Sequence, residues 1–184
     1  MADQPKLLLD ACVLFPTVQR EILIGAAEAG FYRPLWSARI LEEWARAVRK
    51  LGPDAEGIAR VEIALLRARH PRSEVSEAPQ IAARLHLPDE NDLHVLAAAI
   101  GAGADAIVTV NASDFPRGVL AAEGIERRDP DAVLWEFASH QPEKSAAIVE
   151  ASRAKTEAIS GQAQELRAFL KKARLPRLGK LLGA

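Results

Sequence analysis

Short runs of consecutive apolar residues alternate along the chain with longer segments in which apolar positions recur at helical spacing. The two clearest runs, residues 6–10 (KLLLD) and 106–110 (AIVTV), have the length and aliphatic character of buried β-strands. Residues 31–36 are a weaker strand candidate because Pro34 interrupts them, and residues 124–127 could form a final edge strand. The stretch 70–79, with two prolines and several polar residues, is predicted to be a loop.

Capping residues and apolar spacing mark the helices between these runs. Ser37 is a suitable N-cap for a helix that Gly52 closes. In the next predicted helix, over 55–69, four apolar residues fall on one side: Ile58, Val61, Leu65 and Ala68. Further helices are predicted over 18–26, 81–87 and 93–100, and from Asp129 onward.

This alternation of strands and helices predicts a three-layer α/β domain with a mostly parallel central sheet, which we place over residues 1–141. Beyond Pro142 the pattern shows helices without strands, so residues 142–184 are predicted to be a C-terminal helical extension. Five apolar residues of the extension recur at helical spacing and are expected to bury a face against the domain or a second subunit: Ile148, Ile159, Leu166, Phe169 and Leu170.

Composition narrows the class of protein. The 184 residues are 49% hydrophobic and 27% charged, as in soluble globular proteins. Cys12 is the only cysteine, so the chain cannot form an internal disulfide, and we see neither a signal peptide nor an apolar run of membrane-spanning length. These features predict a cytoplasmic protein with no membrane partner.

The formal net charge of −1 hides an asymmetry. From Arg153 onward the chain has eight Lys or Arg against two Glu, a net charge of +6, so the preceding residues carry −7. An acidic body is consistent with a cation site, and a basic tail with nucleic acid or an acidic partner. The alternative for the tail is an ordinary solvated helix face.

Four acidic residues stand where strands end or helices begin: Asp10, Glu43, Asp92 and Asp114. Asp10 closes the strand 6–10, and ligands of parallel sheets bind at the carboxyl ends of the strands. A carboxylate left dry in a core is costly unless it is paired or binds a cation. The alternative for the three aspartates is helix capping, and for Glu43 a solvated helix surface.

Four ordered segments resemble the motifs of PIN-domain ribonucleases, most closely the toxin subunits of VapBC toxin-antitoxin pairs. They are LLLDACVL (7–14), SARILEEW (37–44), PDENDLHVLAAA (88–99) and IVTVNASDF (107–115). The resemblance covers roughly residues 6–138 and leaves the extension outside. It implies that the four acids are catalytic residues that bind Mg²⁺ or Mn²⁺, a cation suited to carboxylate oxygens and phosphate substrates.

Neighbouring residues offer alternatives within these motifs. Glu42 is a rival of Glu43, which we favour because it directly precedes the core residue Trp44. Asp89 is a rival of Asp92 but is better placed as a cap or a supporting acid. The secondary candidates for the site are therefore Asn111, Asp89 and Thr109.

Two residues depart from the family's pattern. Cys12 stands where these proteins often have Asn or Ser, which predicts that one hydrogen bond near Asp10 is missing. Asn111 stands where some members have Asp, which lowers the charge and leaves a second metal position open. His94, on an apolar helix, is expected to be a packing histidine.

The resemblance implies metal-dependent hydrolysis of RNA, with a cognate antitoxin protein and a second copy of the chain as further expected partners. The alternative is a non-catalytic PIN-like module that binds RNA or protein. A haloacid-dehalogenase phosphatase would need an acid at Cys12, and a receiver domain would need a pair of acids after the first strand. The chain also lacks a glycine-rich phosphate loop after that strand.

Overall fold

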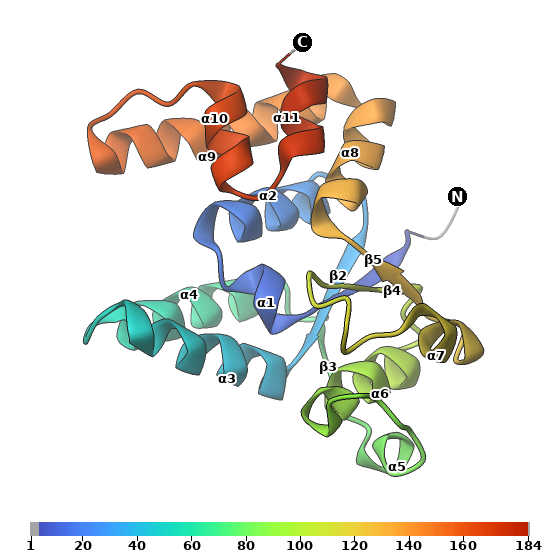
Figure 1. The fold of residues 1–184 in the computed structure, drawn as a ribbon. Coiled ribbons are helices and arrows are strands. Elements are labelled where there is room, and N and C mark those ends of the chain that lie inside the picture. Colours follow the sequence, from blue (N-terminus) through green and yellow to red (C-terminus); the bar gives the residue numbers. More distant parts are fainter. Residues whose placement is uncertain (1–3, 184) are drawn as a thin grey trace.

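A five-stranded parallel sheet runs through the centre of the computed structural model, which describes residues 4–183 (Figure 1). The strand order is β3-β2-β1-β4-β5, and every neighbouring pair is parallel. This sheet confirms the predicted α/β class. The strands are β1 (Lys6–Leu9), β2 (Arg33–Ser37), β3 (Glu74–Val75), β4 (Ala106–Val108) and β5 (Glu126–Arg128).

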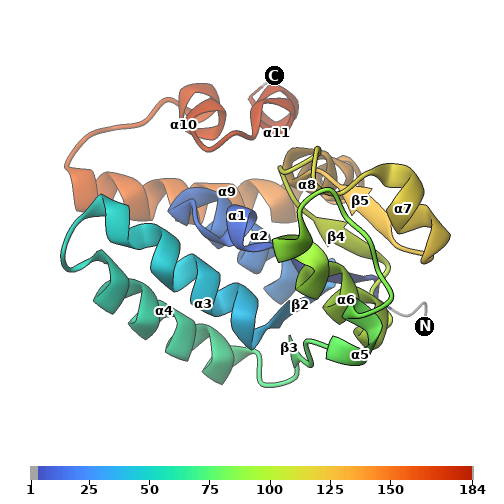
Figure 2. The ribbon, with the colours of Figure 1, turned by 60° about the horizontal axis from the view of Figure 1, so that its bottom comes forward.

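The helices cover both faces of this sheet. Figure 1 shows α5, α6 and α7 below the sheet and α2 and α8 above it, and Figure 2 shows α3 and α4 side by side. The elements of the domain are α1 (Ala11–Leu14), α2 (Thr17–Glu28), α3 (Ala38–Ala47), η1 (Val48–Leu51), α4 (Ala55–Arg69), α5 (Pro79–Ala82), η2 (Glu90–Asp92), α6 (Leu93–Ala102), α7 (Arg117–Ala122) and α8 (Pro130–His140).

Local signals explain several of these boundaries. The Ser37 hydroxyl accepts a hydrogen bond from the Ile40 amide (3.2 Å), so Ser37 caps α3 as predicted. Gly103 ends α6 in the left-handed conformation that glycine adopts without strain. The helix predicted over 81–87 is wrong in extent, because α5 ends at Ala82. Strand β3 was predicted to be loop, since two residues give no periodic signal.

The apolar side of α4 does not face the core. Ile58, Val61 and Leu65 are 60%, 62% and 57% exposed, while Ile63 and Leu66 on the other side are buried. Apolar spacing therefore identified the helix but indicated the wrong face. Among residues 4–183, no helix has both the length and the apolarity that crossing a bilayer requires.

The extension packs onto the domain through a shared hydrophobic core. It comprises α9 (Pro142–Ser160), α10 (Leu166–Lys172) and α11 (Pro176–Leu182), which lie over α2 and α8 in Figure 1. Phe169 and Leu170 are buried, and Ile148 and Leu166 are partly buried against the same core. The expectation for Ile159 is wrong, since it is 79% exposed.

Asp131 joins the two parts. This buried carboxylate on α8 accepts hydrogen bonds from the Arg177 and Leu178 amides (2.8 and 3.0 Å) and so caps the start of α11. We expect Asp131→Ala to lower the free energy of unfolding by about 1–2 kcal/mol, because two amides lose their acceptor. Asp131→Asn, which keeps an acceptor oxygen, should lose less. Urea denaturation of the two variants measures the difference, and equal losses would contradict the capping role.

Candidate metal centre

The acidic residues lie at the carboxyl edge of the sheet. β1 pairs with β2 on one side and β4 on the other, so the chain changes direction across the sheet between β1 and β4. Ligands of open parallel sheets bind at such a switch point. Asp10 directly follows β1, Thr109 directly follows β4, and α3 follows β2.

The side chain of Asp10 is held at the edge of the sheet by Thr109, which follows the neighbouring strand β4. This side chain is 6% exposed, and its Oδ2 accepts hydrogen bonds from the Thr109 hydroxyl (2.7 Å) and the Cys12 thiol (3.0 Å). The Thr109 hydroxyl in turn accepts from the Asn111 amide (3.0 Å). Asp10 occupies the N-cap position of α1, but its side chain makes no capping hydrogen bond. Helix capping therefore does not account for this carboxylate.

Cys12 completes the hydrogen bonds of Asp10 and corrects the expectation that one is missing. Burial, followed by the Asp10 charge, raises the pKa of the Cys12 thiol to about 12. The thiol therefore stays protonated at neutral pH and can donate to Asp10. It replaces the polar side chain expected at this position and does not act as a thiolate ligand.

Three other aspartates converge beside Asp10 and Cys12. Carboxylate oxygens of Asp89, Asp92 and Asp114 lie within 4.8 Å of one another and could hold a metal ion. The Asn111 side-chain amide donates to Asp114 (2.5 Å) and more weakly to Asp92 (3.5 Å), so it links two of these acids. Asp89 accepts from the Asn91 amide (2.9 Å), which confirms its predicted role as a cap.

The electrostatics of Asp92 show how closely the acids are gathered. The pKa of this carboxyl is raised from 3.8 to about 6, first by burial and then by the charges of Asp10, Asp89, Asp114 and Glu43. All four predicted acids therefore belong to one interacting group. Asp10 and Glu43 lie outside the 4.8 Å cluster, and Asp89, which we had ranked as a secondary candidate, lies inside it.

Glu43 approaches the cluster from α3. Its Oε1 lies 3.2 Å from Arg39 Nε and 2.8 Å from Nε2 of His94, a histidine that is only 5% exposed. The rival Glu42 instead binds Arg46 and Arg60, and these hydrogen bonds lower its pKa to about 2. Glu42 is thus held in a surface ion-pair network, which supports the choice of Glu43.

His94 is buried, as predicted for a packing histidine, but its contact with Glu43 was not foreseen. Despite the short distance to Glu43, neither ring nitrogen has a well-aligned hydrogen-bond partner among the described residues. An unpaired polar group in a core is costly. Only its position two residues after Asp92 could have signalled this contact.

The arrangement suits a hard divalent cation. Its donors are carboxylate oxygens with one amide and one hydroxyl, the ligand types that Mg²⁺ and Mn²⁺ prefer. Burial, and then the charges of the neighbouring acids, raise the pKa of Asp92, and a bound cation would stabilise the charged form of this carboxylate.

Comparison with known proteins identifies the domain. A family model described as the PIN domain matches residues 6–113, more than half of the chain. The matched segment includes Asp10, Glu43, Asp92 and Asn111 and ends one residue before Asp114. Neither the curated proteins nor the solved structures contain a significant match to this chain.

Proposed function

The chain belongs to the PIN-domain family, and from this premise we propose that it is a metal-dependent endoribonuclease that hydrolyses RNA phosphodiester bonds. PIN domains are generally nucleases that use divalent metal ions. The observation that carries the proposal is the convergence of Asp89, Asp92 and Asp114, whose carboxylate oxygens lie within 4.8 Å of one another. Such a group is unfavourable unless a cation is bound.

We assign the ligands of Mg²⁺ or Mn²⁺ to Asp10, Asp92 and Asp114, with Glu43 and Asp89 at the sides of the site. When bound, the ion would polarise the scissile phosphate and activate a water for in-line attack. Thr109 and Cys12 fix Asp10 through Oδ2. Asn111 keeps Asp92 and Asp114 together, so the chain presents its acidic groups without a large rearrangement.

Cleavage of labelled single-stranded RNA tests the proposal. We expect cleavage with Mg²⁺ or Mn²⁺ and none with EDTA, because the carboxylates alone cannot activate a water. Undiminished cleavage in EDTA would contradict the proposal. Metal binding and RNA binding without cleavage would instead support the alternative, a non-catalytic PIN-like module.

His94 is expected to position Glu43. Replacing it with Leu should lower metal-dependent cleavage roughly tenfold and raise the Mg²⁺ concentration needed for half-maximal activity, since residues that orient ligands typically contribute 10–100-fold. His94→Gln, which keeps a donor next to Glu43, should retain most of the activity. The KM for RNA should change little in both variants. Equal losses in the two variants, in proportion to their thermal stability, would reduce His94 to a packing role.

We further propose that the protein is the toxin of a type II toxin-antitoxin pair, on the resemblance of its four motifs to VapC-like toxins. The exposed apolar side of α4 supports a protein partner, because contiguous exposed apolar residues mark interaction surfaces. Expression in a bacterial host should arrest growth, and Asp10→Asn should relieve the arrest. Normal growth at equal protein levels would contradict the toxin role. A homodimer and the domain boundary at residue 141 remain predictions for gel filtration and limited proteolysis.

A further inference from the structure

Cations are paired in most of the protein but not in its last two helices. Most arginines of residues 4–141 lie within 4.0 Å of a glutamate oxygen. Residues 166–184 contain six Lys or Arg and no Asp or Glu. These six side chains are exposed, and none lies within 4.0 Å of a carboxylate of a described residue: Arg167, Lys171, Lys172, Arg174, Arg177 and Lys180.

The helices that carry these cations are fixed in place. Leu170, Leu175 and Leu178 bury the inner sides of α10 and α11, so the charged sides face solvent. The start of α11 is tied to α8 by Asp131. The nearest acid in sequence, Glu165, is engaged with the amides at the start of α10. The two helices therefore present a preformed positive surface, which we call the basic platform.

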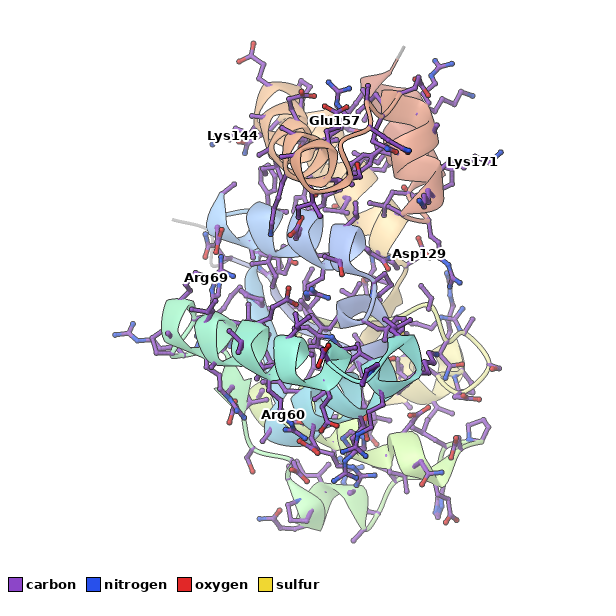
Figure 3. All side chains as sticks on the ribbon, turned by 90° about the vertical axis from the view of Figure 1, so that its left-hand side faces the viewer. Arg60, Arg69, Asp129, Lys144, Glu157 and Lys171 are labelled. Atoms are coloured by element: carbon purple, nitrogen blue, oxygen red, sulfur yellow. The ribbon has the colours of Figure 1, made fainter. Side chains whose placement is uncertain are left out.

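The platform is connected to the carboxyl edge of the sheet by a short path. The Thr109 amide, beside Asp10, donates to the Arg128 carbonyl at the end of β5 (3.0 Å). Three residues later Asp131 holds the Arg177 amide at the start of α11. Figure 3 shows Lys171 and Asp129 toward the same side of the molecule, with Arg69 toward the opposite side. An RNA strand that runs from the acidic site along α8 would reach the basic platform.

We propose that the basic platform binds the backbone phosphates of an RNA substrate that extends beyond the metal site. This inference rests on the proposed nuclease function. Unpaired Lys and Arg attract phosphates regardless of sequence, and their binding releases counterions. The acidic cluster itself repels RNA, so a positive surface elsewhere on the protein gives the substrate a place to bind. RNA too short to reach the platform gains nothing from it.

Removal of the whole extension is a poor test, because Phe169, Leu170 and Leu178 belong to the core. We choose instead Lys171→Gln, Lys172→Gln and Lys180→Gln together, which leave the core unchanged. Arg177 is kept because its guanidinium lies over the Trp135 ring (4.8 Å). The control with the same change in net charge is Arg33→Gln, Arg69→Gln and Arg72→Gln, three exposed cations around the end of α4, of which Arg69 is paired with Glu28.

The measurement is kcat/KM for an RNA of about 40 nucleotides and one of about five, as a function of salt at constant Mg²⁺. For the long RNA, the platform variant should have a smaller slope of log kcat/KM against log salt, by about two, since each phosphate contact contributes about 0.7. The loss of activity between 50 and 200 mM salt should then shrink by roughly 16-fold. The short RNA should be cut as by wild type, which also shows that the variant is folded.

The outcomes separate the two proposals. No cleavage of either RNA by the wild type would overturn the nuclease function and with it this inference. If the platform variant cleaves both RNAs and its salt slope equals that of wild type, the inference is overturned but the nuclease function stands. The platform would then be a binding surface for an acidic protein. Equal changes in platform and control variants would show a general charge effect, which also overturns it.

Discussion

Replacing Asp10 with Asn is expected to reduce metal-dependent RNA cleavage by more than about a hundredfold, since a ligand should matter more than the residues that orient ligands, which contribute 10–100-fold. The fold should survive, because the Asn side-chain oxygen can still accept from Thr109 and Cys12. Cleavage rates at saturating Mg²⁺, together with thermal unfolding, measure both effects.

Asp105→Asn is the matched control for this variant. Asp105 lies at the opposite, amino end of the same two strands, where it accepts a hydrogen bond from the Lys6 amide (2.7 Å). The chemical change is identical, but the carboxylate is remote from the acidic cluster. We expect wild-type cleavage from the control. Cleavage by Asp10→Asn within a few-fold of the control would show that Asp10 is not a ligand.

Replacing Asp92 with Asn is expected to remove activity as well, and to stabilise the metal-free protein at neutral pH. The folded-state pKa of Asp92 is about 6, above its ordinary value of 3.8. Between these values the folded protein binds a proton that the unfolded chain does not, so stability falls as pH rises from about 4 through 6. Above pH 6 the full cost of the buried, repelled carboxylate is present. The Asn variant avoids it at every pH.

The difference between the two proteins isolates this effect. In EDTA, the urea midpoint of Asp92→Asn should exceed that of wild type at pH 7.5, and the gap should close as the pH approaches 4. Mg²⁺ should stabilise wild type more than the variant at pH 7.5, because binding to the folded state alone raises stability. A gap that is independent of pH, or that widens below pH 6, would contradict the raised pKa of Asp92.

Much of the fold could be predicted because its strongest signals are local. The aliphatic runs of β1 and β4 are buried on both faces of the sheet, and Ser37 caps α3 with its own side chain. The place of Asp10 at the end of a strand and of Asp92 at the start of a helix also indicated that both lie at the same edge of the sheet. These features could be predicted because each depends on residues that are close in sequence.

The features that were missed depend on contacts between distant segments. Strand β3 exists only because Trp36 and Ser37 pair with its two residues. Helix α4 packs against α3 with Ile63 and Leu66 buried, so its richer apolar side faces outward. The meeting of His94 with Glu43 joins α6 to α3. The hydrogen bond from Cys12 to Asp10 is by contrast local, and it was not predicted because a thiol is a weaker donor than the Asn or Ser side chain expected at this position.

The most direct test of the metal centre is the anomalous scattering of Mn²⁺ in crystals of the wild-type protein. We expect a peak at about the metal–oxygen distance of 2.0–2.2 Å from carboxylate oxygens of Asp10 and Asp92, with Asp114 beside it. A single peak bound by Asp89 and Asp114 without Asp10, or no peak at the carboxyl edge at saturating Mn²⁺, would contradict the assignment.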